Sequence, residues 1–123
     1  MDIAAAVLVG LVALVHLYFL VLEMFLWRTP RVRRVFGTTE EVAESSAVLA
    51  ANQGLYNGFL AAGLVFGLIA GGAGGTVGFP VTVFFLACVI VAGLYGALTA
   101  NPRILLVQAL PGAVALGLVL IAH

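Results

Sequence analysis

Residues 3–27 read IAAAVLVGLVALVHLYFLVLEMFLW, a run that is apolar almost throughout and is interrupted mainly by His16 and Glu23. A helix of about 20 apolar residues is long enough to cross a membrane. The run therefore predicts a transmembrane helix. A carboxylate in hydrocarbon is costly unless it is partnered or protonated, so Glu23 is the first candidate for a functional residue.

The composition of the whole chain supports the same class. The chain has 123 residues, of which 64% are hydrophobic and 8% are charged, and its mean hydropathy is +1.27. Soluble domains carry about 25% charged residues, so we interpret the chain as an integral membrane protein with a single domain, residues 1–123. The net charge is zero and lysine is absent, which leaves no basic face for nucleic acid.

Three further apolar runs follow the first, and turn-forming residues separate them. The four helices are predicted at about residues 3–27, 46–69, 79–100 and 103–122. The breakers are Arg28-Thr29-Pro30, the glycine-rich residues 71–75 and Asn101-Pro102-Arg103. These features predict an all-α fold, a polytopic membrane protein with a four-transmembrane-helix bundle.

The arginines predict the orientation of this bundle. Four of them lie in the first loop and one in the third, whereas the termini and the glycine-rich loop carry none. Positive residues favour the cytoplasmic side. We therefore expect an inner-membrane protein with its first and third loops in the cytoplasm and both termini outside.

The first loop has a pattern of its own. Val32, Val35 and Phe36 recur at helical spacing among the arginines, which is compatible with a short interfacial helix or with a disordered basic loop. Thr38 and Glu41 have the spacing of a capping box, so the second long helix is predicted to start there, about two turns before it enters the membrane.

Polar side chains recur on one face of each predicted helix. His16 and Glu23 are seven residues apart, about two helical turns, and so belong to one stripe. The polar residues of the second helix fall within an arc of about 140°. The polar positions on the other three helices are Asn52, Gln53, Tyr56, Asn57, Tyr95 and Gln108.

The depths of these residues suggest a common location. At a rise of 1.5 Å per residue, Glu23 lies roughly 12 Å to the cytoplasmic side of its helix centre, and Gln53, Tyr95 and Gln108 lie roughly 7–9 Å to the same side. Polar groups facing lipid would be unsatisfied. We therefore predict an inward-facing polar pocket that opens toward the cytoplasm, with His16 and Asn57 at its floor.

We predict a chemical role for each of these residues in the pocket. Glu23 and His16 are the candidate acid–base groups, and the ligand-binding candidates are Asn52, Gln53, Tyr56, Asn57, Tyr95 and Gln108. Simpler interpretations stay open: Glu23 at the interface beside Arg28, His16 as a hydrogen-bond donor between helices, and the amides as polar contacts that hold the bundle together. One histidine and one glutamate are too few for a metal site, and no cofactor motif is found.

Small residues suggest where helices approach closely. Gly54, Gly58 and Ala62 form a ridge that predicts close packing, either within the bundle or in a homo-oligomer. Pro111 is expected to kink the fourth helix and to free the carbonyl of Val107.

Several of these strings resemble the hallmark segments of the domain of unknown function 1304 family. They are His16 with residues 22–27 (LEMFLW), residues 52–63 (NQGLYNGFLAAG), residues 88–97 (CVIVAGLYGA) and residues 108–111 (QALP). The similarity covers all four predicted helices. It implies a small four-helix membrane protein and brings no established activity.

Three functions compete at this stage. The first is binding, with possible conversion, of a small lipophilic or amphipathic molecule from the bilayer. The second is proton-coupled transport, because a carboxylate in the first of four helices is similar to the arrangement of small multidrug transporters. The third is a structural or assembly subunit in which the polar layer only holds the helices together.

Overall fold

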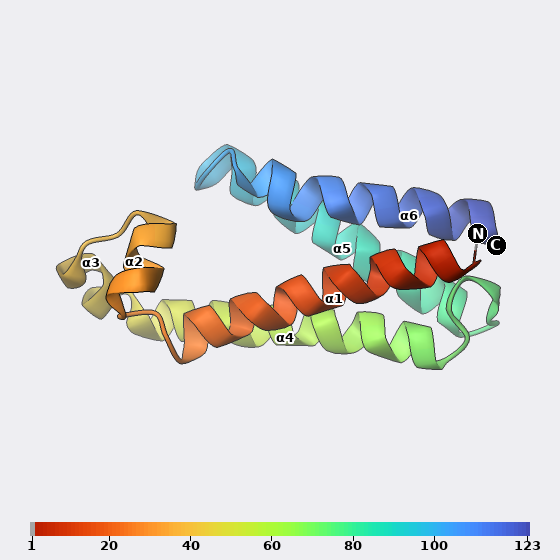
Figure 1. Cartoon of the computed structure of the whole chain (residues 1–123), viewed down its shortest axis with the longest axis horizontal. Coiled ribbons are helices and arrows are strands. Elements are labelled where there is room, and N and C mark those ends of the chain that lie inside the picture. Colours follow the sequence, from red (N-terminus) through yellow and green to blue (C-terminus); the bar gives the residue numbers. More distant parts are fainter. Residues whose placement is uncertain (1) are drawn as a thin grey trace. The chain divides into compact units, whose positions relative to one another are not determined.

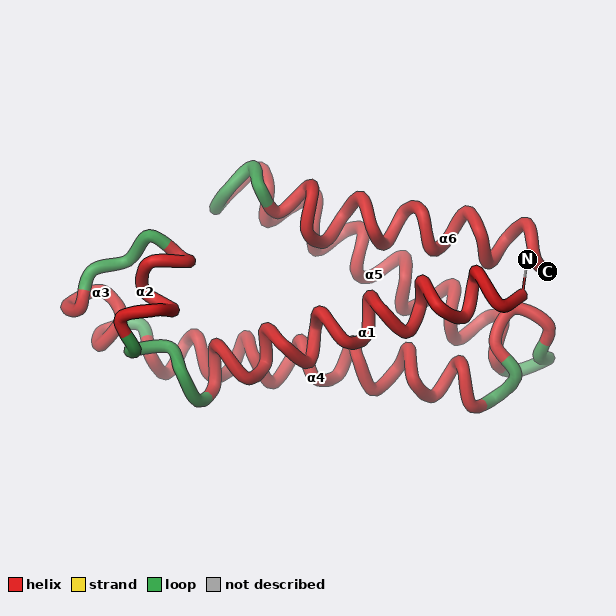
Figure 2. The backbone as a smooth tube through the Cα atoms, viewed as in Figure 1, coloured by secondary structure: helices red, strands yellow, loops and turns green. Residues whose placement is uncertain are grey.

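The computed structural model describes residues 2–123, and within this range the chain forms helices and turns with no strand. The all-α class predicted from the sequence is therefore confirmed. Figure 1 labels the main helices, and Figure 2 marks the loops between them in green. The long helices are α1 (Asp2–Met24), α4 (Ala47–Ile69), α5 (Gly78–Thr99) and α6 (Leu110–Ala122). The short ones are α2 (Pro30–Phe36), α3 (Glu40–Ser45), η1 (Gly72–Gly74) and the π-helical η2 (Leu105–Ala109).

Three helical segments are long and apolar enough to cross a membrane: Ile3–Met24, Gly78–Thr99 and Leu105–Ala122. Only 22% to 33% of the residues in each are buried, and the exposed ones are largely apolar. Such surfaces indicate a lipid environment. The remaining long helix, α4, has 23 residues, but the polar residues between 52 and 57 lower its hydropathy.

The chain divides into two compact units, which we describe separately. One comprises Met1–Leu14 and Leu60–His123 and is called here the glycine-loop unit. The other comprises Val15–Phe59 and is called the acidic unit, because it contains Glu23. Both α1 and α4 contribute residues to each unit.

The glycine-loop unit is held together by apolar packing. Leu64 of α4 and Leu86 and Val89 of α5 are fully buried in one cluster with Val9 of α1 and Val119 of α6. Helix α5 also approaches η2 closely through small residues, since a Cβ on Gly93 would lie 2.6 Å from the backbone nitrogen of Ala109. The core of this unit therefore depends on small residues as much as on large ones.

A π turn precedes the proline of the last helix. The amide of Leu110 donates to the carbonyl of Leu105, five residues earlier, and the turn covers Leu105–Ala109. Pro111 lacks an amide hydrogen, and its ring would clash with the carbonyl of Val107 in a regular helix. Widening the preceding turn relieves this clash, so the disturbance expected from Pro111 takes the form of a π turn.

The acidic unit contains two short helices between α1 and α4 (Figure 1). Thr29 caps α2 through its hydroxyl, which accepts from the amide of Val32, and Gly37 ends α2 in a left-handed conformation with φ 68°. A short helix in the first loop was one of the two open interpretations, and it is the one observed. The cap of α3 is Thr39 rather than Thr38, one residue later than the capping box predicts.

Candidate functional site

The acidic unit brings Glu23 and Asn57 together. The Asn57 amide Nδ2 donates to Glu23 Oε1 at 2.6 Å, joining the last turn of α1 to the middle of α4. Asn57 is buried and Glu23 is half-buried. Among residues 2–123, no ion pair joins Glu23 to an arginine, and the amide of Asn57 is the hydrogen-bond donor that the structure gives this carboxyl group.

Glycines on α4 allow this contact to form. A Cβ added at Gly54 would lie 2.7 Å from Met24 Cγ and 3.1 Å from Glu23 Cβ, and one at Gly58 would lie 2.6 Å from Leu20 Cδ1. The two helices therefore approach closely at Gly54 and Gly58 of α4, which lie on either side of Asn57 in the sequence. For Gly54 and Gly58 the observed packing is within the chain, and a homo-oligomer through this ridge stays a prediction.

Trp27 anchors the turn that follows α1. Its indole nitrogen donates to Ser46 Oγ at 3.2 Å, and its ring lies 4.9 Å from the ring of Phe36 in α2. The sequence predicted α1 as far as residue 27, but the helix ends at Met24. Thr29 is extended where it caps α2 and Pro30 begins that helix, so the chain leaves α1 before them, and the indole reaches both partners from the intervening turn.

A hollow of about 370 Å³ lies beside the carboxylate. Its size falls within the range of small-molecule sites, about 300–1,000 Å³. One wall is acidic and aromatic, and Arg28 adds a positive charge. The lining residues are Glu23, Met24, Phe25, Trp27, Arg28, Thr29 and Ala47. We call this space the Glu23 hollow.

Of the site residues predicted from the sequence, Glu23 lines the Glu23 hollow and the others are not among its lining residues. Trp27, Arg28 and Thr29 line it instead, although none of the three was among the residues predicted to line a pocket. Their signal is proximity, since they follow Glu23 within about two helical turns. Sequence reasoning assigned the pocket to polar helix faces and therefore overlooked the turn.

Other predicted residues lie elsewhere. In the acidic unit, Asn52, Gln53 and Tyr56 are exposed, and Asn52 Nδ2 donates to Val48 O of its own helix at 2.8 Å. Tyr95 and Gln108 belong to the glycine-loop unit, where Tyr95 is exposed and Gln108 is partly buried. Their convergence with Glu23 into one polar layer stays a prediction. A ligand-binding role for each of these five residues likewise stays a prediction.

His16 is fully buried in the structure, with 1% of its surface exposed. Its ring centroid lies 6.2 Å from that of Phe19 in an edge-to-face arrangement. It precedes Glu23 by two helical turns on α1, and it does not line the Glu23 hollow. Its predicted role as an acid–base group stays a prediction.

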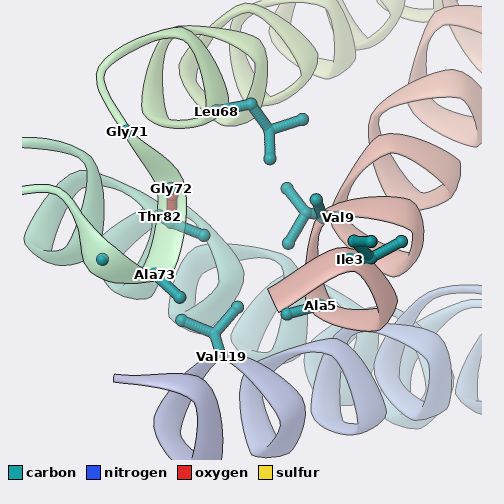
Figure 3. Close-up of a pocket in the computed structure, with 11 residues that line it drawn as sticks. Ile3, Ala5, Val9, Leu68, Gly71, Gly72, Ala73, Thr82 and Val119 are labelled. Carbon is teal, nitrogen blue, oxygen red and sulfur yellow. The ribbon is translucent and has the colours of Figure 1, made fainter. Parts of the chain in front are cut away.

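A second hollow, of about 320 Å³, belongs to the glycine-loop unit (Figure 3). Side chains of Val9 on α1 and Leu68 on α4 point into it, together with Val119 on α6. The hydroxyl of Thr82 is buried without a hydrogen-bond partner. Among the described residues that line this space, none is ionisable. We call it the glycine-loop pocket.

Comparison with known proteins places the chain in a family. No solved structure matches it. The uncharacterized protein YpaA of Lactococcus lactis subsp. lactis (strain IL1403) is 36% identical over 110 residues, which cover 88% of this chain and 89% of that protein. Residues 10–120 match the family described as protein of unknown function (DUF1304). The resemblance noted in the sequence is thereby confirmed, and the chain belongs to the DUF1304 family.

Proposed function

We propose that this chain is a membrane protein that binds a small amphipathic molecule in the Glu23 hollow. The observation that supports this most is the half-buried carboxylate, which bonds to Asn57 and lines a hollow of ligand size. An ionisable side chain in an apolar helix costs free energy when it is buried. Binding a polar group of a ligand would explain why the chain has a glutamate there.

We propose further that α4 is the fourth membrane span and that the Glu23 hollow opens toward the cytoplasm. The 23 residues of α4 are enough to cross a bilayer, since a span needs about 20. The arginines lie in the segments that follow α1 and α5, and the glycine-rich loop has none. This distribution favours a cytoplasmic location for the arginine-containing segments.

A purely structural role makes a different prediction about Glu23. If the carboxylate only joined α1 to α4, its replacement by a neutral amide would change stability and leave ligand content untouched. Conversion of the bound molecule, with Glu23 and His16 as acid–base groups, is a narrower proposal that requires binding first.

Native mass spectrometry tests the binding proposal. The purified chain is incubated with a lipid extract of its expression host, and the small molecules retained per chain are counted. We expect retention by the wild type and by Glu44→Gln, a control that alters an exposed glutamate on α3. Glu23→Gln should lose most of it. Equal retention by Glu23→Gln and the wild type would overturn the proposal.

A further inference from the structure

We propose that the ligand of the Glu23 hollow carries a primary ammonium group joined by a short linker to a phosphate, as in a phosphoethanolamine headgroup. This inference rests on the proposed function and names its substrate class. An acidic and a basic side chain, Glu23 and Arg28, line one hollow within the acidic unit.

The carboxylate selects the ammonium. Glu23 Oε1 accepts from Asn57, the carboxyl group has further lone pairs, and no ion pair joins it to an arginine among residues 2–123. A primary ammonium supplies a full positive charge and three donors. The ring of Trp27, which lines the same hollow, adds attraction for a cation.

Arg28 excludes a ligand with only a positive charge. It is exposed and lines the hollow five residues after Glu23, so it repels a simple cation and attracts an anionic group. Guanidinium groups bind phosphate through paired hydrogen bonds. A simple anion, in turn, would be repelled by Glu23. A zwitterion matches both charges and leaves neither carboxylate nor guanidinium unpaired.

The surroundings of the hollow suit a molecule with an apolar tail. Phe25 lines the hollow and is 71% exposed, and Leu26 beside it is 39% exposed. These apolar surfaces follow directly from a helix long enough to cross the bilayer. A lipid can therefore place its headgroup in the hollow while its acyl chains stay in contact with apolar side chains.

Trp27 provides a reporter for the test, because it is the single tryptophan of the chain and it lines the hollow. The full chain is placed in phosphatidylcholine nanodiscs that contain increasing fractions of one lipid with brominated acyl chains. The brominated lipid is phosphatidylethanolamine, phosphatidylcholine or phosphatidylglycerol. Bromine quenches indole fluorescence only at short range, so quenching reports lipid held beside Trp27.

We expect phosphatidylethanolamine to quench at a lower fraction than either other lipid. Phosphatidylcholine has the same phosphate but no ammonium hydrogens, and phosphatidylglycerol has the phosphate without the amine. Glu23→Gln and Arg28→Gln should each weaken this preference by roughly tenfold, as expected for loss of a charge-assisted hydrogen bond. Two matched controls, Glu44→Gln and Arg103→Gln, should keep it.

The source of the headgroup is tested by competition. If soluble glycerophosphoethanolamine relieves the quenching and glycerol phosphate does not, the free headgroup is recognised. If neither relieves it, the membrane lipid itself is the ligand. Both outcomes support the ammonium–phosphate pair.

Other outcomes overturn the inference. Equal quenching by the three lipids, or a preference that survives both Glu23→Gln and Arg28→Gln, would show that the charges do not select the ligand. If an amphiphile is still retained through Glu23 in mass spectrometry, only the ligand class is wrong. If no amphiphile is retained, the proposed function fails as well.

Discussion

The Glu23 hollow and the glycine-loop pocket have similar volumes, about 370 Å³ and about 320 Å³. Their walls differ in chemistry. The Glu23 hollow is lined by a glutamate, an arginine and a tryptophan among others, whereas the glycine-loop pocket is lined by aliphatic side chains, glycines and one threonine. Volume alone therefore does not identify a binding site in a membrane protein. The presence of ionisable side chains, whose burial costs free energy, is more informative.

The units also differ in how their helices meet. In the glycine-loop unit, α5 and η2 pack backbone against backbone, with Gly93 beside Ala109. In the acidic unit, the atoms nearest to Gly54 are side-chain atoms of Met24 and Glu23 on α1, with the carbonyl oxygen of Leu20 just beyond, and a hydrogen bond from Asn57 completes the contact. Substitutions should therefore disturb stability more in the first unit and ligand binding more in the second.

The largest loss of stability is expected for Gly93→Ala. The new Cβ would lie 2.6 Å from the nitrogen and 2.9 Å from the Cα of Ala109, backbone atoms that cannot rotate away. We expect a loss of about 3 kcal/mol, the upper end for overpacking. Detergent-induced unfolding in mixed micelles measures it. Gly117→Ala is the matched control, because nothing lies within 4 Å of its Cβ; equal losses would refute the backbone contact.

Asn57→Ala should cost less, about 1–3 kcal/mol, because it leaves the carboxylate of Glu23 without its donor. The same unfolding assay applies. Asn52→Ala removes an amide that bonds only within its own helix, so its effect should stay within about 0.5 kcal/mol. A double variant that replaces both Glu23 and Asn57 by leucine should recover the lost stability while ligand retention is abolished. Failure of that recovery would mean that the pair is structurally required.

Gly54→Ala is expected to have a smaller effect on stability, about 1 kcal/mol, with a clear effect on binding. The nearest atom to the new Cβ is Met24 Cγ, which can move, but Glu23 Cβ at 3.1 Å is attached to the backbone of α1. The displaced carboxylate should retain less amphiphile in native mass spectrometry. Gly10→Ala, with open space around its Cβ, should retain as much as the wild type. Unchanged retention in Gly54→Ala would contradict the role of this close approach.

Trp27→Phe should have the smallest effect, about 0.5–1 kcal/mol, since it removes one partly buried hydrogen bond and keeps an aromatic ring. Ser46→Ala removes the acceptor and also the 2.6 Å hydrogen bond that Ser46 Oγ donates to Val42 O, so it should cost more than Trp27→Phe. In a double-mutant cycle, the two changes together should cost little more than Ser46→Ala alone. Additive losses would mean that the indole and the hydroxyl act independently.

Hydropathy and helical periodicity were sufficient to predict the all-α class and to single out Glu23, because both depend on residue type and local spacing. Periodicity also placed Asn52, Gln53, Tyr56 and Asn57 on one arc, but it could not tell which edge of that arc meets a neighbouring helix. The structure shows that α1 meets the glycine side of α4, so that Asn57, at the edge of the arc, reaches Glu23 while Asn52 does not.

Contacts between distant residues account for the features that the sequence did not predict. The end of α1 before Arg28-Thr29-Pro30 fits the breaker found in the sequence, but the contact of Trp27 with Ser46, nineteen residues away, has no local signal. The wall of the Glu23 hollow comes mainly from the turn after α1, which is why its residues could not be assigned from helix faces.

The π turn before Pro111 should let the last helix tolerate the loss of one residue, provided that Pro111 is replaced as well. A π turn accommodates one residue more than regular helix, and that residue would rotate everything after it by about 100° if the turn were absent. Deleting one residue from Leu105–Ala109 alone should place Pro111 in a regular helix and create the clash that the turn avoids. Replacing Pro111 alone removes the clash but leaves the extra residue of the π turn in the helix. The two changes together should restore a regular helix whose later residues keep their present orientation. The deletion and the replacement of Pro111 should therefore compensate for each other.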